Sequence, residues 1–184
     1  MKRKMLPVLL CLCLLLTGCG GHEREKRFVS FSQALSEAAQ LRFTAELKLN
    51  LGGEPLSFTL AYQRDAEGQR VEILKPERVA GVKAHVAPGS STLEFEGLIL
   101  DLGPLDPYGL SPMNALPTLV EALCAGHLDS HWEEDGDLAC RLIVDDHRAA
   151  TVWFRSEEMV PLRAELQSGE KLNITCEIQD WHTE

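Results

Sequence analysis

Apolar and polar residues alternate with a period of two along most of this sequence, which restricts the chain to an antiparallel β-sheet with one buried face. The alternation is clearest in residues 42–51, and after Gly52-Gly53 it returns in residues 56–63. Two alternating segments joined by a glycine turn predict a β-hairpin. Its apolar side includes Phe43, Leu47, Leu49, Phe58 and Leu60.

Shorter alternating segments continue the pattern to residue 178, with Gly, Pro or Asp residues between them. The segment 82–86 begins with Val82, and a later one presents Leu98, Leu100 and Leu102 on one side. Each is typical of a short strand in a meander, with its apolar side buried. The sequence predicts about ten strands in all.

Two segments depart from the period of two and predict helices. Phe31 and Leu35 fall at helical spacing, and Ser30 or Ser32 can cap the start, which predicts a short N-terminal helix. Ser111-Pro112 places a capping residue before a proline at the first helical position, and Gly126 can end the helix. The apolar stripe of this inserted helix includes Leu116, Val120 and Leu123, and Pro117 interrupts it.

About ten one-sided strands predict a mainly β (α+β) fold in which a strongly curved antiparallel sheet, or half-barrel, has an apolar concave side. The N-terminal helix and the inserted helix are the segments that can cover this side. A flat two-layer sandwich is the alternative. The predicted apolar cavity is lined by Phe43, Leu47, Leu49, Phe58, Leu60 and Val82 and covered by Leu116, Val120 and Leu123. The same side chains could instead meet in a fully packed core.

The first eighteen residues have the pattern of a signal peptide. Basic residues at positions 2–4 precede an apolar run over residues 5–16, which is too short for a permanent membrane span. The run ends in Leu16-Thr17-Gly18-Cys19, which resembles the bacterial lipobox. Cys19 is therefore predicted to carry acyl chains, which would anchor the protein on the extracytoplasmic face of a membrane. An ordinary secretory signal is the alternative.

The predicted organisation is a signal peptide over residues 1–18, a lipidated cysteine with a tether over residues 19–29, and one folded domain over residues 30–184. The signal peptide holds three basic residues and no acidic one, so the formal net charge of −10 for the whole chain becomes −13 for residues 19–184. Such a charge repels nucleic acid and anionic headgroups, which excludes nucleic-acid partners. Cys140 and Cys176 lie on apolar sides of alternating segments, as expected for buried thiols, and Cys124 is the third cysteine after Cys19; one disulfide among these three is the alternative.

The sequence predicts no metal, no cofactor and no catalysis. His127 and His131 are four residues apart in a predicted strand, where they would lie about 13 Å from each other, too far to share one ion. The acidic segment 133–137 matches a hairpin turn better than a calcium loop. No nucleophile elbow, zinc-protease motif or phosphate-binding glycine loop occurs.

The order of these elements resembles the LolA/LolB-like lipoprotein-carrier superfamily over about residues 30–181. Its most specific part is the C-terminal run, in which Val152-Trp153-Phe154, the segment 160–165 (VPLRAE) and a last strand ending in Trp181 follow one another. The segment 73–81 (ILKPERVAG) also contributes. The resemblance implies a half-barrel that holds acyl chains under a helix and does no catalysis.

Soluble carriers of this superfamily lack a lipid anchor, so the anchor predicted at Cys19 rules out a shuttle. The resemblance then implies an anchored lipoprotein that binds acyl chains, lipids or lipidated proteins during envelope assembly. GerS-like germination lipoproteins of spore-forming Firmicutes resemble the same fold. For that group the implied role is a scaffold for an envelope protein partner, with a packed core.

Overall fold

The computed structural model describes residues 20–49, 54–87, 90–103, 110–169 and 172–184, so the predicted signal peptide and Cys19 lie outside the described residues. The elements in chain order are α2 (Gly20–Glu37), β1 (Leu41–Leu49), β2 (Leu56–Asp65), β3 (Gly68–Lys75), the 3-10 turn η1 (Glu77–Val79), β4 (Lys83–Ala87), β5 (Ser90–Phe95), β6 (Leu98–Gly103), α3 (Pro112–Ala125), β7 (His127–Glu134), β8 (Asp137–Ile143), β9 (Arg148–Arg155), β10 (Val160–Ser168) and β11 (Leu172–Thr183).

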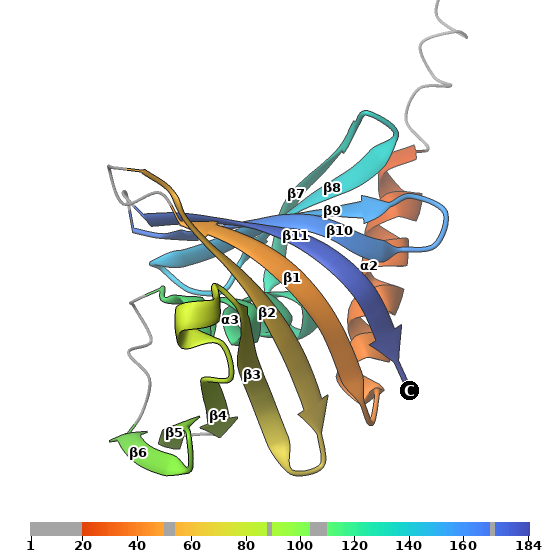
Figure 1. Cartoon of the computed structure of the whole chain (residues 1–184). Helices are drawn as coiled ribbons and strands as arrows, with labels where there is room; N and C mark the ends of the chain where they lie inside the picture. Colours follow the sequence, from red (N-terminus) through yellow and green to blue (C-terminus); the bar gives the residue numbers. More distant parts are fainter. Residues whose placement is uncertain (1–19, 50–53, 88–89, 104–109, 170–171) are drawn as a thin grey trace, which may run out of the picture.

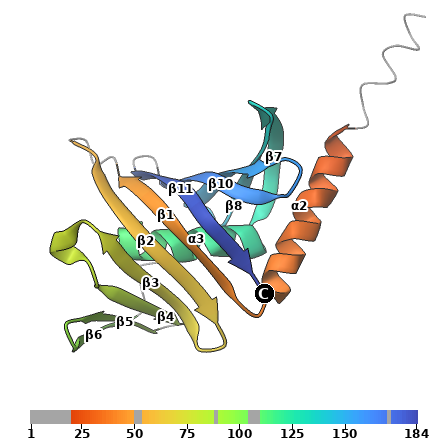
Figure 2. The same ribbon diagram turned by 45° about the vertical axis from the view of Figure 1, so that its right-hand side comes forward.

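The strands form one antiparallel sheet of eleven strands in the order β6-β5-β4-β3-β2-β1-β11-β10-β9-β8-β7. All neighbours are consecutive in sequence except β1 and β11, which pair from Leu41↔Thr183 to Leu49↔Ile174 and join the two halves of the chain. The sheet curves strongly without closing (Figure 1, Figure 2). The predicted half-barrel is confirmed, and the sandwich alternative is wrong, because a sandwich needs two sheets.

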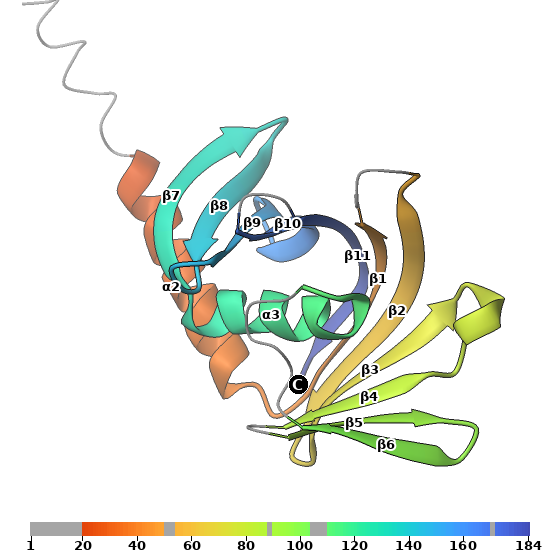
Figure 3. The same ribbon diagram turned by 90° about the vertical axis from the view of Figure 1, so that its left-hand side faces the viewer.

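The two helices cover different parts of the sheet. Helix α3 lies across the concave side, as Figure 3 shows, and contacts β3, β8, β9 and β10. Helix α2 runs beside the β7 end of the sheet and packs against both β7 and α3. The inserted helix therefore fills the concavity as predicted.

The alternation along β1 is followed residue by residue in the structure, because Leu41, Phe43 and the three apolar residues that follow at every second position are buried while Arg42 and Lys48 are exposed. The buried side of β1 shares one core cluster with residues of α3 and of the other half of the sheet. Folding therefore depends on a continuous apolar concave face.

Within the described residues helix α2 spans Gly20–Glu37, so residues before position 30 that were expected to form a tether are helical. Charged residues support the first turns: Glu23 and Lys26 form an ion pair one turn apart. Arg24 also pairs with Glu133 of β7. The side chain of Phe28, within the same segment, is only 3% exposed.

The apolar side of β6 is not buried as expected. Leu98 and Leu100 are 77% and 59% exposed, and Leu102 is also exposed. The strand lies at the end of the sheet, and its concave side extends past the strands that α3 contacts. An alternating pattern predicts which side is apolar, but it does not predict whether another element covers that side.

Trp153 points away from the core and is buried on the convex side. Its ring lies 6.5 Å from that of Trp132, edge to face, and the guanidinium of Arg163 stacks 4.1 Å from its centre. Arg163 also donates a hydrogen bond of 2.7 Å to Glu134. Hydrogen bonds, first from the Trp132 indole and also from Arg163, hold the pKa of Glu134 below its usual value.

Candidate functional site

The structure brings the predicted concave residues together in one core. Seven of the nine are buried, and the other two, Phe58 and Val82, are half-buried and pack against the same cluster. The buried ones are Phe43, Leu47, Leu49 and Leu60 of the sheet and Leu116, Val120 and Leu123 of α3.

This core is closed to water. The buried lining residues are 0–3% exposed, and Leu47, Leu60, Leu116 and Leu123 are each at 0%. A cavity wide enough for an acyl chain would admit water and leave exposed area on its lining. The contact between the concave face and α3 is therefore a packed interface, and a ligand could enter only if α3 moved.

Polar contacts fasten α3 near its C-terminal end. Ser32 and Ser36 of α2 donate hydrogen bonds of 3.2 and 3.4 Å to the carbonyl oxygen of Cys124. The Arg64 guanidinium on β2 lies 3.4 Å from the Cys124 sulfur. One turn earlier, Glu121 pairs with Arg148 of β9 at 2.9 Å.

The N-terminal end of α3 is built differently. Asn114 Oδ1 accepts a hydrogen bond of 2.6 Å from the Ser111 backbone N–H, which caps the first turn locally. Pro117 lies inside the helix, where it cannot donate a backbone hydrogen bond to the preceding turn. At the other end only glycine fits at Gly126, because a Cβ there would lie 2.4 Å from the Ala122 carbonyl oxygen. Because Pro117 lacks this hydrogen bond, the first turn of α3 is less firmly joined to the C-terminal end that Ser32, Ser36 and Arg64 hold.

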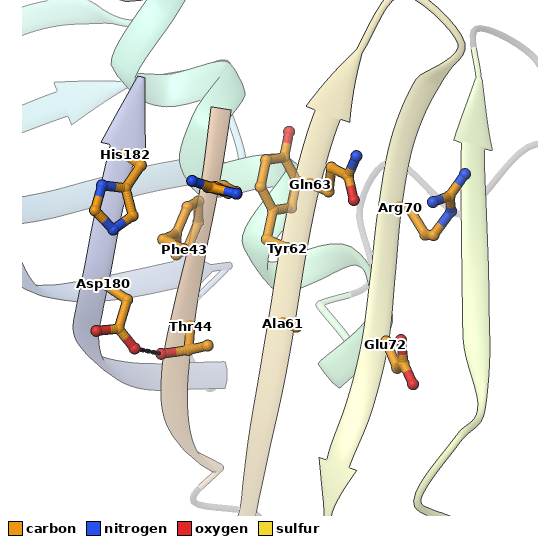
Figure 4. A pocket seen from close by; sticks show the side chains of 10 residues that line it. Phe43, Thr44, Ala61, Tyr62, Gln63, Arg70, Glu72, Asp180 and His182 are labelled. Atoms are coloured by element: carbon orange, nitrogen blue, oxygen red, sulfur yellow. Dashed lines mark hydrogen bonds between the residues drawn. The ribbon is translucent and has the colours of Figure 1, made fainter. Parts of the chain in front are cut away.

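A groove of about 310 Å³ lies on the opposite, convex side of the sheet, as Figure 4 shows. A β-bulge lies beside it: the pairing of β1 with β11 shifts between Arg42 and Thr44, and Asp180 has a positive φ of 53°. The bulge turns Trp181 toward the core, where it stacks on Phe43 with the ring centres 4.9 Å apart. The groove is lined by Arg42, Phe43, Thr44, Ala61, Tyr62, Gln63, Arg70, Glu72, Asp180 and His182.

The polar side chains of the groove suit a polar ligand group. The cross-strand register sets His182, Arg42 and Gln63 side by side, with Arg70 next in the same row. Across from this row, Thr44 donates a hydrogen bond of 3.2 Å to Asp180. Sequence reasoning missed this groove, although a signal was present, because the apolar residues Ile178 and Trp181 are three apart where the strand pattern requires an even spacing.

Burial raises the pKa of three titratable side chains: Cys140, Cys176 and Tyr62. Burial raises the pKa of the Cys140 and Cys176 thiols to about 12, so both are protonated at neutral pH. Both sulfurs are free, as expected of small buried apolar groups. Burial also raises the pKa of Tyr62, whose hydroxyl donates a hydrogen bond of 2.9 Å to Gln69.

The described residues bring together no group of three His, Cys, Asp or Glu side chains that could hold a metal ion. His127 and His131 both lie in β7, as the sequence predicts, and Nε2 of His131 is 3.0 Å from the Gly21 carbonyl oxygen of α2. Within the part of the chain that the structure describes, no helix has both the length and the apolar character needed to cross a membrane.

Comparison with known proteins gives matches in structure. No protein-family profile and no curated protein sequence matches the chain. A DUF1329 family protein from Desulfovibrio piger aligns over 89% of this chain and 92% of its own, with a TM-score of 0.53 and 12% identity. A domain assigned as an outer membrane lipoprotein-sorting protein from Vibrio parahaemolyticus covers the same shares, with a TM-score of 0.50 and 10% identity. A LolA superfamily protein from Nitrosomonas europaea aligns over 88% of this chain and 93% of its own, with a TM-score of 0.48 and 7% identity.

At these identities the first two matches, with TM-scores of 0.53 and 0.50, show a common fold. The first two cover nearly the whole described domain, including both halves of the sheet. The half-barrel fold that the resemblance implied is therefore confirmed: this chain shares its fold with the Desulfovibrio piger and Vibrio parahaemolyticus proteins.

Proposed function

We propose that this chain is a non-enzymatic envelope lipoprotein, held on the extracytoplasmic face of a membrane through Cys19, that takes up an acyl chain between its concave face and α3. The observation that supports uptake is the cover of the concave core: a single inserted helix closes it, with polar contacts near one end and a proline in the middle. Because lipid tails are apolar, the lining residues suit them without any polar partner.

Opening would begin at the first turn of α3. Lifting this end of the helix would separate Leu116 from the core cluster that it shares with Leu47 and Leu60, while the bonds of Cys124 keep the C-terminal end in place. An acyl chain that fills the resulting space restores the lost burial, at about 0.8 kcal/mol for each buried CH₂. Pro117 would act as the hinge.

The anchor is tested by Cys19→Ala. The variant should accumulate as an unprocessed precursor and should lose metabolic labelling with a fatty acid, because the acceptor sulfur is gone. Labelling that persists in this variant would show that Cys19 is not the lipidated residue.

Uptake is tested with residues 20–184, a fluorescent fatty acid and mass spectrometry of solvent extracts. Pro117→Ala should slow uptake and raise the free energy of unfolding, because it restores a helical hydrogen bond and stiffens the hinge. Pro112→Ala is the matched control: a proline at the start of a helix interrupts no bond, so this change should leave uptake unaltered. Equal rates in the two variants would contradict the hinge.

A second candidate is a scaffold for a protein partner in which the core stays packed. The complete burial of Leu47, Leu60, Leu116 and Leu123 favours it. If no lipid co-purifies and no fatty acid is taken up, the acyl-binding proposal fails and the scaffold remains.

A further inference from the structure

Strand β6 is an apolar strand at an open edge of the sheet. It is the terminal strand on its side and pairs only with β5 among the described strands. Leu98 and Ile99 are 77% and 72% exposed, and Leu100 and Leu102 are exposed as well. An edge strand with a bare backbone and large apolar side chains is a template for pairing with another strand.

Both faces of β6 carry exposed apolar side chains. Leu100 pairs with Leu93, which pairs with Ala84, and Ala84 pairs with the core residue Val71, so these side chains share the concave side. Ile99 points to the convex side. Lipid contact on one face would leave the other apolar face in water, whereas a neighbouring strand covers side chains on both faces.

The backbone of β6 also favours a polypeptide partner over a lipid. The N–H and C=O groups on its outer edge have no strand partner within the described residues. A lipid tail offers nothing to these groups, but an extended polypeptide pairs with the whole row.

The charges around β6 indicate which polypeptide fits. The hairpin from Ser90 to Gly103 contains Glu94, Glu96 and Asp101 and no Lys, Arg or His. Glu94 lies 3.6 Å from His85, while Glu96 and Asp101 form no ion pair with any residue that the structure describes. A second copy of this strand would bring acidic groups together, which disfavours self-pairing. A segment with basic side chains would be attracted.

We propose that β6 is a docking edge for an extended segment of another protein, which adds a strand to this sheet and carries apolar residues at alternate positions with Lys or Arg between them. The proposal does not depend on acyl uptake, because it involves the opposite edge from α2 and no movement of α3. It gives the chain a defined contact for a protein partner.

The probe is a ten-residue peptide that alternates valine with lysine and carries a fluorescent label. It is titrated with the full chain in phosphatidylcholine nanodiscs, and its anisotropy is measured. A second peptide replaces each lysine with glutamate, and a third bears methyl groups on its backbone nitrogens. The lysine peptide should bind best. The methylated peptide should lose about tenfold or more in affinity, because it keeps the side chains and lacks the backbone donors.

Two variants and a control locate the site. Leu100→Lys should weaken the lysine peptide by about tenfold, through lost apolar burial and charge repulsion. Asp101→Lys should weaken the lysine peptide and strengthen the glutamate peptide, each by about two- to fivefold. The control is Leu74→Lys, at an exposed apolar position on the interior strand β3, which should leave binding unchanged.

Several results would overturn the proposal. One is that none of the peptides binds. Another is that the methylated peptide binds as tightly as the lysine peptide. A dimer of the full chain in detergent that Leu100→Lys dissociates would assign the edge to a second copy. Strong quenching of an Ile99→Trp variant by brominated phosphatidylcholine, beyond that of the unchanged chain, would assign it to the lipid surface.

Discussion

The two edges of this sheet expose the same kind of backbone and protect it very differently. Strand β7 at one edge has the sequence HLDSHWEE, with polar side chains at six of its eight positions, and α2 packs beside it. Strand β6 at the other edge has the sequence LILDLG, and five of its six residues are exposed. Charged side chains and a covering helix are two ways in which proteins protect an edge.

The contacts at β7 show how its protection works. Arg24 of α2 pairs with Glu133, and His131 reaches the Gly21 carbonyl oxygen, so polar groups of the strand are linked to the helix. At β6 the only charged side chain is Asp101, which accepts a hydrogen bond from the Gly103 N–H close by. The contrast between the apolar edge at β6 and the protected edge at β7 supports the proposal that β6 binds a partner.

The strongest test of the comparison removes the cover of β7. Phe28→Ala deletes a buried ring of α2 that lies 6.1 Å from Phe154, and it should lower the free energy of unfolding by about 3–5 kcal/mol. Urea unfolding measures this loss, and hydrogen exchange at β7 amides should accelerate. Leu100→Ala, at the bare edge, should change stability by less than about 0.5 kcal/mol. Similar losses in the two variants would mean that β6 is covered in solution.

Much of this architecture could be predicted from the sequence, because the alternation records which side of each strand is buried. The side chains of Phe43, Leu47 and Leu60 lie where the pattern places them. Helix α3 could also be predicted, since Ser111, Pro112 and Gly126 define its ends locally. Local signals of this kind require no knowledge of neighbours.

The parts that could not be predicted depend on contacts between distant segments. The first turns of α2 have no apolar periodicity, and the Arg24 pair with Glu133 connects residues 109 positions apart. The exposure of Leu98 depends on how far α3 extends over the sheet. The convex groove lies beside the bulge at Asp180, where the sequence carries only an odd spacing before Trp181.

A smaller loss of stability is expected when the ion pairs that Arg148 forms with Glu121 and Asp145 are removed. Arg148 of β9, 13% exposed, pairs with Glu121 of α3 and, at 2.7 Å, with Asp145. Arg148→Ala should therefore cost about 1–3 kcal/mol. Leu100→Ala at the bare edge again serves as the reference.

The same cluster predicts a dependence on pH. Burial alone would raise the pKa of Asp145, but hydrogen bonds from the His147 backbone N–H and from Arg148 outweigh it and hold the pKa below its usual value. A lowered pKa means that this contribution is present above the ordinary Asp pKa of about 3.9 and is lost as the pH falls through the lower, folded value. Asp145→Asn should flatten the acid side of the stability profile below about pH 4. If Asp145→Asn left the pH dependence of stability unchanged, Asp145 would not be the group responsible for it.

The smallest effect concerns the single ion pair that links α2 to the β7 edge. Arg24 and Glu133 are 39% and 55% exposed, so solvent screens their attraction, and Arg24→Ala should cost only about 0.2–1 kcal/mol. The loss should shrink in about 1 M salt, where the Debye length falls to about 3 Å. Arg70→Ala provides a control of similar exposure, because Arg70 pairs with Glu67 within the β2–β3 hairpin. If the ion pair contributes to edge protection, Arg24→Ala alone should accelerate hydrogen exchange in β7, most clearly at low salt. Equal exchange in both variants would mean that the apolar packing of α2, through Phe28, accounts for the protection by itself.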